Sequence, residues 1–186
     1  MQYLQPQNDD NLTQFCEYLC PGHSPELISV QPPSYAKIGH CYENVEKRIK
    51  QKGGTAVYGW EISSCEGIWL EAQFHCIWKS PKGKYIDVTP EHFGRDQVLF
   101  LKDTLRVYKG TPIHIERFSI KGFDRGKVQR AWKMQDQILS EYDLLQAQGI
   151  DPQSQLGVTF IQSKLLEYQS LIVELNGEDD TNAFSS

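Results

Sequence analysis

Residues 38–54 read IGHCYENVEKRIKQKGG, and residues 55–62 continue with TAVYGWEI. In the first stretch, apolar side chains recur at every fourth position, at Cys41, Val45 and Ile49. Charged residues fill the opposite face. This spacing predicts an amphipathic helix that begins near Gly39 and ends at Gly53. The second stretch is rich in β-branched and aromatic residues and predicts a strand. A helix that starts at a cysteine and leads directly into a sheet therefore organises the predicted fold.

Two more strands are predicted immediately downstream. Residues 68–78 alternate well enough for a strand, and residues 84–88 make another after the turn signal SPKG at 80–83. Together with residues 55–62 they are expected to form an antiparallel meander. Shorter strands are expected at 98–101, 105–108 and 113–118.

The chain before this region has a different character. Residues 1–7 are polar and are expected to be frayed. Residues 10–19 carry an apolar face and predict a helix that ends before Pro21. Residues 23–38 contain three prolines and are interpreted as an irregular connection.

The chain after the meander is predicted to be helical. Residues 126–148 lack proline and carry one apolar side. A second stripe recurs at spacings of three and four: Val158, Ile161, Leu165, Tyr168, Ile172 and Leu175. We expect an α+β protein with a core over 1–122, a helical hairpin packed on it over 123–176, and a disordered tail over 177–186. The stripe is interpreted as core, with a homodimer through these helices as the open alternative.

Composition excludes several classes of protein. The 186 residues carry 19 Lys plus Arg against 24 Asp plus Glu, a formal net charge of −5, which argues against a nucleic-acid partner bound by phosphate neutralisation. No apolar run reaches the length of a membrane span, so no membrane partner is expected. Five cysteines, an odd number, without a signal peptide favour a reducing, cytoplasmic location over a disulfide framework. No cofactor is indicated.

One cysteine has the surroundings that a nucleophile requires. A thiol at the start of a helix lies at the positive end of the helix dipole, which favours the thiolate. Such a thiol also requires a base, and the base requires an acceptor that fixes its tautomer. The next predicted strands supply His75 and Asp87, and two adjacent antiparallel strands can place these residues opposite each other. We therefore expect a triad of Cys41, His75 and Asp87.

The three blocks that carry this triad also resemble a known superfamily. They are Gly39, Cys41 and Tyr42, then Phe74, His75 and Trp78, then Gly83, Asp87, Thr89 and Pro90. In this order they resemble the transglutaminase-like branch of the papain-like cysteine enzymes, over residues 38–90. The resemblance implies a papain/transglutaminase-like core, with the nucleophile helix packed on an antiparallel sheet.

The resemblance also implies a thiol-dependent hydrolase or acyltransferase that acts on an amide or acyl bond. Such an enzyme is a thiol protease, an amidase or deamidase, or a transglutaminase-type transferase, and a protein or peptide is the expected substrate. Tyr42 stands where the family commonly has Trp. The chain also lacks a Gln a few residues before the cysteine. Candidates for the oxyanion hole or the cleft are Gln31, Tyr35, Asn44 and Trp60, and the Cys41 backbone N–H could also donate.

Two other interpretations stay open. The chain could be a non-catalytic protein-binding module on the same scaffold, with the helical part recognising a partner. It could also be a small structural zinc protein, because Cys16, Cys20 and His23 are ligand types within a short span and His40-Cys41 could complete the sphere. The spacing fits no common zinc finger, so no metal is the preferred expectation.

Overall fold

The structure of the protein is a computed structural model, which describes residues 3–7, 9–91, 94–106, 114–120, 122–152 and 154–182. This part of the chain is α+β, with four helices and an antiparallel sheet of seven strands. It divides into two compact units, 1–118 and 119–186.

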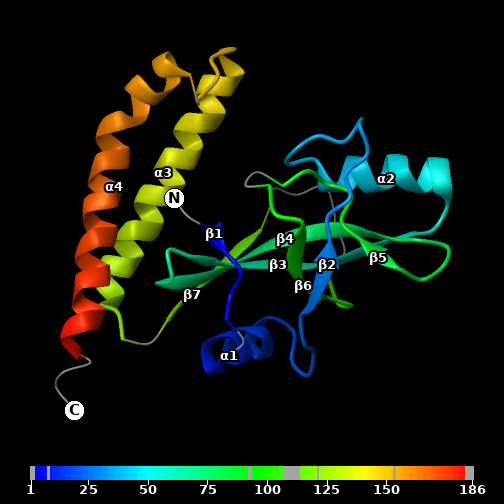
Figure 1. Ribbon diagram of the computed structural model, residues 1–186, viewed down its shortest axis with the longest axis horizontal. Coiled ribbons are helices and arrows are strands. Elements are labelled where there is room, and N and C mark those ends of the chain that lie inside the picture. The colour runs from blue at the N-terminus through cyan, green and yellow to red at the C-terminus, as the bar shows by residue number, and fades with distance from the viewer. Residues whose placement is uncertain are drawn as a thin grey trace. The chain divides into compact units, whose positions relative to one another are not determined.

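The sheet of the first unit has the strand order β2-β6-β3-β4-β5, with β1 added on β3 and β7 on β4 (Figure 1). The strand bounds are Tyr3–Leu4 (β1), Glu26–Ser29 (β2), Thr55–Cys65 (β3), Trp69–Lys79 (β4), Tyr85–Ile86 (β5), Gln97–Lys102 (β6) and Ile115–Ser119 (β7). The three strands of the predicted meander correspond to β3, β4 and β5, and they are confirmed as consecutive antiparallel neighbours.

The β3–β4 hairpin is longer than the sequence predicts. Pairing runs from Thr55↔Lys79 to Cys65↔Trp69, whereas residues 63–67 were expected to turn. Glu66 and Gly67 both have positive φ, 57° and 74°, and the reversal takes only the three residues 66–68. A turn with positive φ at both central positions matches the twist of paired strands, which lets the ladder continue to its end.

The two edges of the sheet meet at one point. A parallel bridge joins Val30, just after β2, to Asp87, just after β5. Two backbone hydrogen bonds secure it, from Asp87 N to Ser29 O at 3.0 Å and from Gln31 N to Asp87 O at 2.7 Å. The sheet therefore curls on itself and has an inner and an outer face.

Each face carries its own apolar cluster. The inner cluster contains Ile28, Val57, Ile77, Val98 and Phe100. On the outer face, helix α2 (Cys41–Lys52) packs against β4 through a second cluster: Cys41, Val45, Cys76, Trp78, Ile86 and Val88. Burying one such aliphatic or aromatic side chain is worth about 1.5–3 kcal/mol, so the outer cluster fixes the helix on the sheet.

Several local predictions are wrong where distant pairing decides the structure. Residues 3 and 4 are not frayed, because they form β1 and pair with Ser64 and Cys65 of β3, while residues 1 and 2 lie outside the described residues. The stretch 23–38 is not wholly irregular, because β2 pairs with β6. Residues 105 and 106 do not form a strand, because Asp103 accepts hydrogen bonds from both of their backbone N–H groups. Residues 107–108 lie outside the described residues.

The first helix, α1 (Asp10–Leu19), matches its predicted range. Its N-cap is Asp9, since Asp9 Oδ1 accepts from Leu12 N at 2.9 Å. The apolar face is buried as expected: Leu12, Phe15, Cys16 and Leu19.

The second unit contains two long helices, α3 (Arg125–Ala147) and α4 (Gln155–Asn182), which run side by side as a hairpin (Figure 1). The predicted stripe of α4 is buried at Ile161, Tyr168, Ile172 and Leu175, whereas Val158 is 40% exposed. The α4 helix also continues to Asn182, where a disordered tail was expected from 177, because no proline interrupts its propagation. Residues 183–186 lie outside the described residues. A homodimer through these helices stays a prediction.

No helix within the described ranges combines the length and the apolar character needed to cross a bilayer.

Candidate functional site

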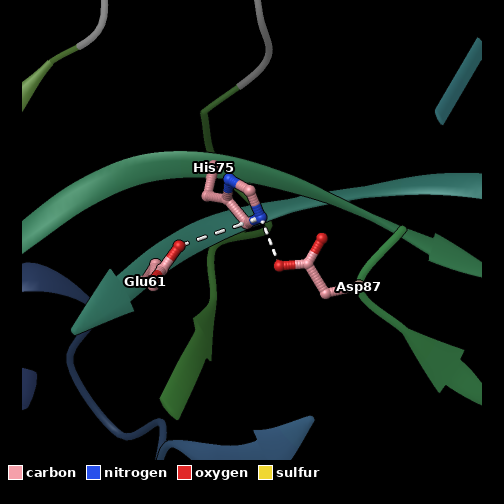
Figure 2. A group of neighbouring side chains, drawn as sticks. All are labelled: Glu61, His75 and Asp87. Carbon is pink, nitrogen blue, oxygen red and sulfur yellow. Dashed lines mark hydrogen bonds and ion pairs between the residues drawn. The ribbon is translucent and has the colours of Figure 1, made fainter. Parts of the chain in front are cut away.

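His75, on β4, is held by Asp87, which follows β5. His75 Nε2 donates to Asp87 Oδ2 at 2.9 Å, and both residues are buried (Figure 2). The register pairs Trp78 with Ile86, so by extension Asp87 would face Ile77 and lie diagonal to His75. The two residues therefore share the inner face, although they are not directly opposite as predicted. Diagonal neighbours on one face are still within reach of long side chains.

Asp87 is oriented by the point where the sheet closes. Its backbone is bonded to Ser29 and Gln31, and its second carboxylate oxygen, Oδ1, accepts from Thr89 N at 2.8 Å. The Asp-x-Thr spacing therefore has a local function: the Thr89 amide fixes one oxygen so that the other is presented to His75.

Cys41 is the first residue of α2, as predicted, and its thiol lies close enough to the His75 ring to act on the charge of that ring. Because Nε2 is used by Asp87, Nδ1 is the nitrogen that remains for Cys41. The predicted residues Cys41, His75 and Asp87 are thus brought together in the order thiol, imidazole, carboxylate.

The contacts of His75 favour its charged form. Burial opposes protonation of the ring, but the charge of Asp87, the hydrogen bond that His75 donates to it and the nearby Cys41 outweigh burial and hold the pKa of His75 well above its usual value. An imidazolium next to a thiol is the arrangement that stabilises a thiolate.

Burial keeps three other cysteines in the thiol form. Burial raises the pKa of Cys16 and of Cys20 to about 11, and that of Cys76 to about 12. These thiols stay protonated at neutral pH. Cys76 lies in the outer cluster, on the face away from His75, as predicted.

A second carboxylate lies at the same nitrogen of His75. Glu61, on β3, places Oε2 at 3.9 Å from His75 Nε2 (Figure 2). Arg95 Nη2 donates to Glu61 Oε1 at 3.0 Å and to Glu91 Oε1 at 2.7 Å. Glu61 is not among the residues predicted for the site. Strand alternation could have pointed to it, since Glu61 lies four residues after Val57 and therefore on the same inner face of β3.

A glycine makes room for the aromatic wall of the site. Gly59 pairs with His75 across the β3–β4 ladder. A Cβ at Gly59 would lie 2.6 Å from Phe100 Cζ and 2.3 Å from Leu101 O. The Phe100 ring occupies this space and meets the His75 ring at an angle of 69°, with 6.5 Å between the ring centroids.

Glu61, His75 and Asp87 are also the group that could hold a metal ion within the described ranges. Their present contacts favour a hydrogen-bonded network instead, since His75 Nε2 is engaged by Asp87 and the Arg95 cation lies on Glu61. The predicted zinc alternative does not assemble: Cys16 and Cys20 are buried, whereas His23 is exposed with Nδ1 at 3.1 Å from Pro21 O.

Gln31 and Tyr35, two of the predicted oxyanion candidates, contact different parts of the structure. Gln31 is exposed, but its backbone N–H binds Asp87 O, so closure of the sheet brings it beside the triad despite its distance in sequence. The Tyr35 ring lies 4.2 Å from Lys47 Nζ, six residues beyond Cys41. The Tyr35 ring therefore contacts a side chain of the helix that carries Cys41.

Asn44 and Trp60 have structural contacts. Asn44 Nδ2 donates to Lys37 O at 2.7 Å and Oδ1 accepts from Lys37 N at 3.0 Å, which ties the preceding loop to α2. Trp60 does not line a cleft, because it is fully buried and its Nε1 donates to Asp103 at 3.1 Å. It alternates to the face opposite His75, a consequence of strand periodicity.

The triad is enclosed. Cys41 is 5% exposed and His75 is 6% exposed. A pocket of about 150 Å³ opens on the inner face, and neither residue is among its lining residues: Ser24, Glu26, Ile28, Val57, Ile77, Tyr85, Phe100 and Lys102.

No protein-family model matches the chain, and no curated protein or solved structure matches it either. A functional assignment therefore rests on the contacts within the chain, and above all on those of His75.

Proposed function

We propose that the protein is a thiol-dependent hydrolase or acyltransferase with a papain/transglutaminase-like core, in which Cys41 is the nucleophile, His75 the acid and base, and Asp87 the orienting acid. The observation that supports the proposal is the position of the His75 ring, with Nε2 bonded to Asp87 at 2.9 Å and the Cys41 thiol, at the start of α2, close to the ring.

The reaction follows from this arrangement. The Cys41 thiolate attacks an amide or acyl carbonyl carbon, and the helix N-terminus lies where the carbonyl oxygen gains negative charge. His75 gives its proton to the leaving amine, the C–N bond breaks, and a thioester forms on Cys41. A water or an amine then loses a proton to His75 and attacks the thioester, which releases the thiolate. Water gives proteolysis or deamidation, and an amine gives acyl transfer, with a protein or peptide as the substrate.

Alkylation by iodoacetamide tests the proposal. At pH 6, Cys41 is expected to react at least about tenfold faster than glutathione, because an imidazolium keeps its thiolate available. Mass spectrometry of peptides locates the adduct. Cys41→Ala should remove the fast phase and His75→Ala should slow it. Cys76→Ala is the matched control, since it removes a neighbouring thiol and should leave the fast phase intact. A wild-type Cys41 that reacts no faster than glutathione would contradict the proposal.

A protein-binding module on the same scaffold is the second candidate. The observation that favours it is the burial of Cys41 and His75, both less than a tenth exposed. In that case, Cys41 should be alkylated only when urea unfolds the chain, at the same urea concentration as Cys76.

A further inference from the structure

We propose that Glu61 is a positioning residue for His75: its carboxylate, held by Arg95, keeps the Nε2 edge of the ring directed away from Cys41 and supports the charged imidazole. This inference rests on the proposed function, in which His75 must present its other nitrogen to Cys41.

Glu61 lies on the same face of the sheet as His75. Gly59 lies directly across from His75 on β3, and Glu61 is two residues farther along the same face. Asp87 approaches from the other neighbour of β4. His75 thus receives one carboxylate from each flanking strand, at 3.9 Å and 2.9 Å, and both are directed at Nε2. A flipped ring would present a carbon to both carboxylates, so the pair selects one ring orientation.

The Glu61 carboxylate is held in place by Arg95. Arg95 bonds Glu61 Oε1 and also bonds Glu91, and its own backbone N–H donates to Glu91 Oε2 at 3.1 Å. The Glu61 side chain is 17% exposed and the Arg95 side chain 20% exposed. Because Arg95 occupies Oε1, the other oxygen of Glu61 is the one directed to His75.

Two carboxylates surround the His75 ring. The charged or titratable groups that face His75 are Glu61 from β3, Asp87 after β5 and Cys41 from α2, while β6 contributes the neutral Phe100. Burial raises the pKa of Glu61, and the cations His75 and Arg95 oppose this shift. The ionised form of Glu61 therefore depends on the cations beside it. The converse dependence, of the charged His75 on Glu61, is part of the proposal and follows from the 3.9 Å between Glu61 Oε2 and His75 Nε2.

The titration of His75 tests this inference directly. With histidine labelled by ¹³C and ¹⁵N, and His75 assigned through His75→Gln, Glu61→Gln should lower the titration midpoint of His75 by about one unit or more. Glu91→Gln is the matched control, because it removes a carboxylate from the same arginine without removing one from His75. It should move the midpoint much less. EDTA in the buffer excludes a bound metal as the cause.

A midpoint that is unchanged in Glu61→Gln, while Asp87→Asn lowers it, would overturn the inference and leave Glu61 a partner of Arg95 only. If Glu61→Gln does not fold, Glu61→Asp gives the same test, since it withdraws the charge by one methylene and must also lower the midpoint. The titration can be followed in Cys41→Ala. Failure of the proposed function would appear separately, as slow alkylation of Cys41 with the midpoint shift intact.

Discussion

Two buried aspartates, Asp87 and Asp103, have opposite environments. Asp103, after β6, accepts from Leu105 N and Arg106 N on Oδ1, and from Trp60 Nε1 and Arg106 Nη1 on Oδ2. Asp87 accepts from the Thr89 amide on Oδ1 and from a titratable ring, His75, on Oδ2.

The difference lies in the donors. All four donors of Asp103 keep their protons at any ordinary pH. Burial works against ionisation of Asp103, but the hydrogen bonds from Arg106, Leu105 and Trp60 outweigh it, and the pKa of Asp103 is lowered. Such a carboxylate holds structure in place. Asp87 instead shares its charge with a group that can gain or lose a proton, which is what acid–base chemistry requires.

The largest expected effect is the loss of stability in Asp103→Asn. The amide would present an N–H group to donors that need an acceptor, and the charge opposite Arg106 would be lost. We expect the free energy of unfolding to fall by about 3 kcal/mol, measured by urea denaturation. Alkylation of Cys41 in the folded variant should be unchanged. A loss below about 1 kcal/mol would remove the structural role given to Asp103.

The matched change, Asp87→Asn, should act on reactivity instead. Asparagine can still accept from His75 Nε2, so the fold is retained, but the imidazolium loses its closest counter-charge. Alkylation of Cys41 at neutral pH should slow by about tenfold, which corresponds to one pKa unit of His75. Equal reactivity of Asp87→Asn and wild type would show that the carboxylate does not control the thiol.

The two clusters should also respond to pH with opposite signs. The pKa of His75 is raised above 6.5, so its contribution to stability is complete below pH 6.5 and is lost as the pH rises through the folded value, at a rate of at most about 1.4 kcal/mol per pH unit. The pKa of Asp103 is lowered below 3.8, so its contribution is present above pH 3.8 and is lost as the pH falls through the folded value. Urea midpoints across the pH range should lose their alkaline decline in His75→Gln and part of their acid decline in Asp103→Asn. A variant that retains its decline would contradict the assignment.

The smallest expected effect is that of Trp60→Phe. It removes one donor to Asp103 while the ring still fills the core, so the free energy of unfolding should fall by about 1 kcal/mol. The alkylation rate of Cys41 should be the same as in wild type. A slower rate would show that Trp60 affects Cys41 and would contradict a purely structural role for Trp60.

The parts of the fold that the sequence predicts are those set by local pattern. The α2 helix follows from apolar residues four apart, and the β3–β4 hairpin from β-branched and aromatic runs. The proximity of His75 and Asp87 can also be predicted, because Asp87 directly follows the strand beside that of His75 and a short turn joins the two strands.

The parts that escaped prediction depend on partners far along the chain. β2 is four residues long and exists because β6 lies beside it. The Val30–Asp87 bridge has no local signal in either segment, and Glu61 became relevant only when Arg95 and His75 were placed next to it. Trp60 is a cleft candidate by residue type, but strand alternation directs it to the face opposite His75, where it is fully buried.

The bridge between Val30 and Asp87 has a kinetic consequence. Val30 and Asp87 are 87 − 30 = 57 positions apart, so the bridge requires the closure of a long loop, which is a slow event in folding. The contact between His75 and Asp87 spans only 12 positions and can form earlier. The Asp87 backbone is bonded to Ser29 and Gln31 only once the bridge has closed, so the proposed acid would gain its final orientation when the sheet is complete.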